Sequence, residues 1–177
     1  MKRVTEERYL AEFVYGGIDG VITTFAIIAG AIGASLNTVV ILILGFANLF
    51  ADGFSMAVSN YLSTKSQHEL NLRHKHLHQH KDKNPRRTAV AIFISFVFIG
   101  IIPLLSFVLA PFSQTIEENK FTISFVMTAL ALVIVGAIKG KIVEKNYLHS
   151  AIETLIIGGI AAIIAFIVGV FIKGIFV

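Results

Sequence analysis

The stretch Val14–Gly33 reads VYGGIDGVITTFAIIAGAIG, an apolar segment rich in glycine with one acidic residue, Asp19. An α-helix needs about 20 apolar residues to cross the hydrocarbon core of a bilayer, and this stretch has that length. An ionised carboxylate near the centre of such a helix costs about 2.5–3.5 kcal/mol or more, so acids found there usually have a function. The segment therefore predicts a membrane-spanning helix with a functional acid.

The rest of the chain is also apolar in long blocks. Of its 177 residues, 55% are hydrophobic and 15% are charged, and the mean hydropathy is +0.79. Each block is continuously apolar instead of alternating, which favours helices over the strands of a barrel. We predict an all-α, polytopic membrane protein that forms one integral membrane domain over residues 1–177. Its five transmembrane helices are expected near residues 13–34, 38–62, 88–109, 121–138 and 151–172.

The basic residues indicate how the chain is oriented. If the N-terminus is cytosolic, all but two of the 15 lysines and arginines lie on the cytosolic side, the exceptions being Lys120 and Lys173. This bias follows the positive-inside rule, so we expect a cytosolic N-terminus and a C-terminus on the far side. Membrane topology therefore explains the excess of basic over acidic residues, and no nucleic-acid partner is expected. The chain has no cysteine, which excludes disulfides and thiolate metal ligands.

The second apolar block contains a polar stripe. Asn48, Asp52, Met56 and Asn60 recur every four residues, so they share one helix face. Met56 and Asp19 each lie about six residues from the cytosolic end of a helix, roughly 9 Å deep. A carboxylate beside a thioether suits a divalent transition metal, whereas Mg²⁺ and Ca²⁺ sites use oxygen ligands. We predict Asp19 and Met56 as metal ligands, with Asp52 assisting or carrying a proton and Asn48 adding a carbonyl oxygen.

Each of these residues also has a structural interpretation. Met56 alone is typical of apolar packing, and the asparagines are typical of hydrogen bonds between helices. Asp19 would be structural if it paired with a lysine, but the first three blocks contain no lysine or arginine. Gly16 and Gly20 predict close helix contacts, either inside one bundle or between two subunits. Pro103 predicts a kink in the third helix.

Residues 67–87, QHELNLRHKHLHQHKDKNPRR, are expected to form a cytosolic loop between the second and third helices. If the second helix continues outward, pairs of histidines four residues apart can share a metal ion, and an irregular run still forms a loose chelator. The alternative is a solvated basic loop that only sets the orientation. The histidines of this candidate metal-recruiting loop are His68, His74, His76, His78 and His80.

Two segments resemble a known family. GGIDGVITTFAIIAGAIGAS (16–35) and ADGFSMAVSNYLSTKSQ (51–67) are similar to the vacuolar iron transporter family of ferrous iron and manganese exporters. The resemblance covers nearly the whole chain and is strongest over Glu12–Gln67. It implies a five-helix homodimer with metal pathways near the subunit interface, which moves Fe²⁺ or Mn²⁺ out of the cytosol in exchange for protons.

The resemblance also implies site residues. The pathway aspartate of the first helix corresponds to Asp19, the pathway methionine of the second to Met56, and an acid near the start of the first helix to Glu12. Plant-type members have a glutamate where this chain has Asn48, and they carry a large Glu-rich cytosolic domain between the second and third helices. This chain has only the short histidine loop there, so it resembles a short form of the family.

The sequence thus predicts a divalent-metal transporter that exports Fe²⁺ or Mn²⁺ from the cytosol by proton antiport and has no permanently bound cofactor. Mixed oxygen and thioether ligands do not discriminate between the two metals. The chain contains no HExxH, no GxSxG and no nucleophile–base cluster, so an enzyme is not expected. The alternatives are an exporter of small molecules or lipids, and a non-transporting membrane assembly protein. Because no targeting extension precedes the first helix, a prokaryotic cell membrane is expected, with the vacuolar membrane as the alternative.

Overall fold

The computed structural model describes residues 2–73 and 83–176, and the side chains of residues 9–72 and 83–176. The described residues form α-helices joined by short turns and 3₁₀ segments, and they include no strand. Five helical segments are long and apolar enough to cross a membrane, which confirms the prediction of an all-α fold with five such helices. They are Tyr9–Gly33, Thr38–Leu72, Pro85–Phe112, Gln114–Ile142 and Tyr147–Phe176.

The helices extend beyond the apolar blocks that identify them. The 36 residues of α2 are about 54 Å long, well over the ~30 Å of a hydrocarbon core. Residues 67–73, expected in the loop, are the last turns of α2; their Gln, Glu, Leu and Arg residues are good helix formers. The main helices are α1 (Lys2–Gly33), α2 (Thr38–Arg73), α3 (Pro85–Gly100), α5 (Gln114–Ile142) and α6 (Tyr147–Phe176).

The third membrane span is interrupted, as Pro103 predicts. After α3 ends at Gly100, the chain forms the 3₁₀ turn η1 (Ile102–Leu104), the short helix α4 (Leu105–Leu109) and a second 3₁₀ turn, η2 (Ala110–Phe112). Proline has no N–H to donate, so a helix interior cannot continue regularly through it. The hydroxyl of Ser124 on α5 donates a hydrogen bond of 2.7 Å to the carbonyl of Pro103, which satisfies an acceptor at the break.

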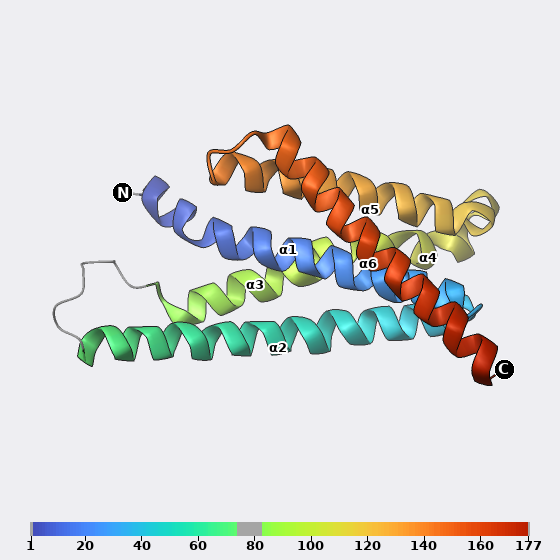
Figure 1. Cartoon of the computed structure of the whole chain (residues 1–177), viewed down its shortest axis with the longest axis horizontal. Helices are drawn as coiled ribbons and strands as arrows, with labels where there is room; N and C mark the ends of the chain where they lie inside the picture. The colour runs from blue at the N-terminus through green and yellow to red at the C-terminus, as the bar shows by residue number, and fades with distance from the viewer. Residues whose placement is uncertain (1, 74–82, 177) are drawn as a thin grey trace.

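Helix α1 lies in the middle of the bundle. In Figure 1, α2 and α3 run along one side of α1, α5 runs along the other, and α6 crosses it. The marked chain ends lie at opposite ends of the bundle, as an odd number of spans requires (Figure 1). The long helix α6 is continuously apolar from residue 155 to residue 172, and most of its large side chains are exposed, as expected for a helix that faces lipid.

Glycines let α1 approach its neighbours closely. A Cβ at Gly16 would lie 2.7 Å from the carbonyl oxygen of Ile92, and one at Gly20 would collide with the backbone of Phe96. At the other end of α1, a Cβ at Gly169 of α6 would collide with the carbonyl oxygen of Gly30. The small residues singled out in α1 are therefore used for packing inside one chain, which was one of the two interpretations.

We predict that Gly20→Ala lowers the free energy of unfolding by about 1–3 kcal/mol, because the added methyl group overpacks the contact between α1 and α3. Gly159→Ala is the matched control, since a Cβ at this α6 position has no neighbour within 4 Å. Thermal unfolding of both variants in detergent micelles measures the difference. Equal effects of the two substitutions would contradict the close contact.

Candidate metal pathway

The structure brings the two membrane acids together. Asp19 on α1 and Asp52 on α2 are both partly buried, and their carboxylates are close enough to repel each other. Among the residues whose side chains are described, neither forms an ion pair with a lysine, arginine or histidine. Two carboxylates without a positive partner in a membrane-spanning bundle form a place where a cation is stabilised.

A hydrogen-bonded link joins α1 to α2 next to this pair. The Thr23 hydroxyl donates to the backbone carbonyl of Asp19 at 2.8 Å, and the Asn48 amide nitrogen donates to the Thr23 hydroxyl at 3.3 Å. The Asn48 amide nitrogen donates this bond. The amide oxygen, which is the acceptor atom of the group, is the atom of Asn48 that suits a cation. Asn48 thus takes part in bonding between helices, and its role as a ligand stays a prediction.

Met56 lies at the edge of an apolar cluster. It is partly buried and packs against a core formed by α1, α2, α3 and the segment after Pro103. Apolar packing, the structural interpretation of this residue, is therefore present. Met56 follows Asp52 by one turn on the same face of α2, so its role as a soft ligand stays a prediction. The core residues of the cluster are Ile28, Ala31, Ile41, Leu49, Phe96, Leu104 and Phe107.

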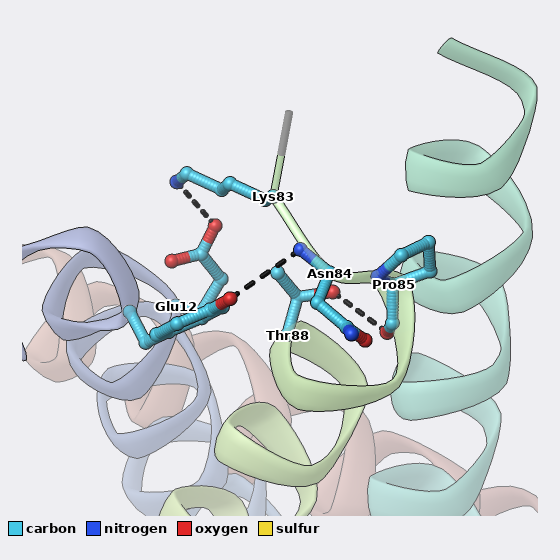
Figure 2. A network of polar contacts seen from close by, with 6 residues as sticks. Glu12, Lys83, Asn84, Pro85 and Thr88 are labelled. Atoms are coloured by element: carbon cyan, nitrogen blue, oxygen red, sulfur yellow. Dashed lines mark hydrogen bonds and ion pairs between the residues drawn. The ribbon is translucent and has the colours of Figure 1, made fainter. Parts of the chain in front are cut away.

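Glu12 has a partner that the sequence analysis missed. Its Oε1 accepts a hydrogen bond and ion pair of 2.6 Å from the ammonium of Lys83, just before α3 (Figure 2). The two residues are 71 positions apart, so no spacing pattern could have paired them. Glu12 precedes Asp19 by two helical turns, which places the two carboxylates on one face of α1, about 10 Å apart along its axis.

Asp19 also lines a groove between α1 and α5. The groove has a volume of about 370 Å³, and Lys139 of α5 lines it as well. The ammonium of Lys139 donates to Glu153 on α6 at 3.2 Å, so this lysine has another partner. The expectation that Asp19 has no deep counter-ion therefore holds for the described side chains. The lining residues are Ala11, Val14, Tyr15, Ile18, Asp19, Lys139, Ile142 and Val143.

Only one histidine of the expected metal-recruiting loop lies among the described residues. His68 lies on the exposed last turns of α2, whereas His74, His76, His78 and His80 lie outside the described residues. Within the described part of the chain, no group of three or more His, Asp or Glu residues could hold a metal ion. Metal recruitment by this segment stays a prediction.

Three serines of α2 are exposed on the outside of the bundle, although Asn48 and Met56 of the same helix contact other helices. Ser55, Ser59 and Ser63 are exposed and share a face with the partly buried Asp52. The opposite face of α2, with Phe54 and Tyr61, borders a groove shared with α3. The helix therefore turns its apolar side toward its neighbour α3 and leaves polar groups on the outside of the bundle.

Comparison with known families agrees with this arrangement. The model of the VIT family matches residues 10–81 and 68–170, which together cover most of the chain. The chain belongs to the VIT family. This confirms the resemblance seen in the sequence. The two matched segments overlap over residues 68–81, which include the end of α2 and lie before α3, where plant-type members carry their additional domain according to the resemblance.

Similar VIT proteins come from several organisms. The vacuolar iron transporter of Plasmodium berghei (strain Anka) is 25% identical over 95% of this chain and 84% of its own length. Vacuolar iron transporter 1 of Arabidopsis thaliana is 25% identical, covering 93% and 86%. Vacuolar iron transporter homolog 4 of the same plant is 29% identical, covering 90% and 81%. The first two alignments span 228 and 220 positions, against 177 residues here, so those relatives carry inserted segments and this chain is a short form.

We predict that Asp52→Asn raises the melting temperature of the metal-free protein, because it removes the repulsion between Asp52 and Asp19. Mn²⁺ should stabilise the wild type by about 2.7 kcal/mol at 100 times its Kd and stabilise the variant less. Glu118→Gln, at an exposed position near the start of α5, is the control and should change neither value. Equal stabilisation of all three proteins by Mn²⁺ would argue against a shared site.

Proposed function

We propose that this protein transports a divalent transition metal, Fe²⁺ or Mn²⁺, across its membrane, with Asp19 as the central ligand and Asp52 beside it. The observation that carries the proposal is the pair of uncompensated carboxylates on two adjacent membrane helices. The names of its relatives, vacuolar iron transporters, support iron as a substrate. A dication between the carboxylates offsets their repulsion, and Met56 and Asn48 would add a sulphur and an oxygen donor.

The same pair supports exchange with protons. Carboxylates bind metal only when they are deprotonated, so metal binding releases protons and protonation releases metal. A site that alternates between the two cations exports metal from the cytosol when a proton gradient drives protons inward. Antiport and outward direction are therefore part of this proposal, with the metal as cargo and no resident cofactor.

The location in a membrane is carried by the five spans. The relatives are named vacuolar and come from eukaryotes, so they lend no support to the prediction of a prokaryotic cell membrane. Membership of a family whose members are named transporters supports the prediction that the chain is not an enzyme.

The first test is metal flux in proteoliposomes with an imposed pH gradient. We predict that wild type moves Fe²⁺ or Mn²⁺ but not Mg²⁺, and that Asp19→Asn reduces flux to the background of empty vesicles because it removes the central charge. Glu118→Gln, which also neutralises one acid, should transport like the wild type.

Two other functions give different results in this assay. Flux of no divalent ion in either protein would favour an exporter of small molecules or lipids. An assembly protein would also become more stable on neutralisation of Asp19, since a buried charge without a partner destabilises a fold, but unlike a transporter it would lose no function.

A second copy of the chain is also part of the proposal. The exposed serines of α2 would face lipid in a monomer, where polar groups find no partners, and the partly buried Asp52 lies on the same side of the helix. Two copies related by a two-fold axis would turn these stripes toward each other and enclose a polar path between them. This homodimer places the acids near the subunit interface.

The chain contains no cysteine, so single cysteines report on this interface directly. We predict that Ser59→Cys in membranes gives a covalent dimer with a short thiol-specific cross-linker, because the α2 stripes of two copies meet. Ile163→Cys, on α6 and 61% exposed, is expected to face lipid and to remain monomeric on the same gel. A stronger cross-link through Ile163→Cys would contradict this arrangement and indicate that the subunits meet at α6.

A further inference from the structure

The two oxygens of the Glu12 carboxylate have different surroundings. The side chain is only 13% exposed, and its Oε1 is bound to Lys83. Its Oε2 is buried and has no hydrogen-bond partner among the described residues. A buried, charged oxygen without a partner is costly, so this site is half-satisfied and would gain from a cation that reaches both oxygens.

The residue after Lys83 is hydrogen-bonded to α1 and α3, while the Lys83 side chain itself is partly exposed. The Asn84 N–H donates to the Tyr9 hydroxyl at 3.3 Å, which ties the start of α3 to α1. The Asn84 side chain accepts from the N–H groups of Arg86 and Arg87 and caps α3. The Lys83 side chain is 39% exposed, and its flexible stem lets the ammonium leave Glu12 for water without unfolding the cap.

Glu12 lies where a cation would arrive before it reaches Asp19. The membrane span of α1 runs from Tyr9 to Gly33, so Glu12 lies in its first turn and Asp19 two turns deeper on the same face. A cation moving inward along this face from that end meets the Glu12 carboxylate first. At present, a positive charge supplied by the chain itself occupies that carboxylate.

The family resemblance already implies Glu12 as a pathway acid; we propose that Lys83 regulates it, because the Lys83 ammonium occupies the Glu12 carboxylate until a divalent cation displaces it. The inference rests on the proposed function, because it places Glu12 on the route to Asp19. Lys83 is then a tethered competitor that sets the metal concentration at which the site fills. A dication has the advantage over the single ammonium charge, since it can also engage the unpartnered Oε2.

The test is Mn²⁺ binding to the full-length chain in detergent, followed by the paramagnetic resonance signal of free Mn²⁺. All variants carry Asp19→Asn, so that the deep site does not contribute. We expect Lys83→Gln to tighten binding by roughly threefold to fivefold, the range expected for loss of a partly exposed ion pair. Lys83→Arg keeps the competing charge and should bind like the Lys83 protein, and Glu12→Gln should remove the site.

Two comparisons separate competition from other effects. In the Glu12→Gln background, Lys83→Gln should have no effect, because the two residues act on one site. Lys65→Gln removes the same charge from an exposed pair with Glu69 on α2 and should leave Mn²⁺ affinity unchanged. If Lys83→Gln does not fold, Lys83→Met, which retains the apolar stem, replaces it.

Unchanged or weaker Mn²⁺ binding in Lys83→Gln would overturn the proposal and leave the ion pair as a tie between α1 and α3. Absence of any Mn²⁺ binding that depends on Glu12 would overturn it as well. In flux measurements with Asp19 intact, Lys83→Gln should lower KM and leave kcat unchanged, which a purely structural role would not do. Failure of the proposed function is seen separately, as an absence of flux in the wild type.

Discussion

The close contact of α1 with α3 and α6 is the constraint on which the rest of the structure depends. At Gly20, the backbone of α1 lies so near α3 that no Cβ fits, and at Gly30 it lies so near α6 that no Cβ fits on Gly169. This contact holds α1 at the centre of the bundle, between α2 and α3 on one side and α5 on the other (Figure 1). Glu12 and Asp19, the acids of α1 whose side chains the structure describes, therefore lie against the start of α3 and in a groove beside α5, respectively.

The two described acids of α1 lie at different depths in the bundle and have different partners. Glu12, in the first turn of the α1 span, has a lysine from the start of α3. Asp19, two turns deeper, has a second carboxylate nearby and no positive partner among the described side chains. The chain thus neutralises the acid at the end of the α1 span and leaves the deeper acid without a positive partner among the described side chains. That gradient suits a cation that enters from solvent and replaces the missing charge inside.

Much of the fold could be read from local patterns. The apolar blocks identify five membrane helices because each helix satisfies its own backbone hydrogen bonds and must be apolar over the bilayer. Pro103 identifies the break in the third span for an equally local reason, the missing N–H. The end of α2 could not be read in this way, because residues 67–73 are polar and yet helical. Polarity marks the limit of the membrane and does not mark the end of a helix.

The sequence by itself determined the membrane class, the number of spans, the polar face of α2 and the presence of an acid in the first helix. Only the tertiary structure decided that Asp52 lies near enough to Asp19 for the two charges to repel, that Asn48 donates a hydrogen bond to Thr23 and that Lys83 forms an ion pair with Glu12. The physical reason is that helical periodicity fixes which residues share a face but not which face meets which neighbour. That choice is made by close packing between helices, through contacts such as Gly20 against Phe96 that join residues far apart in the chain.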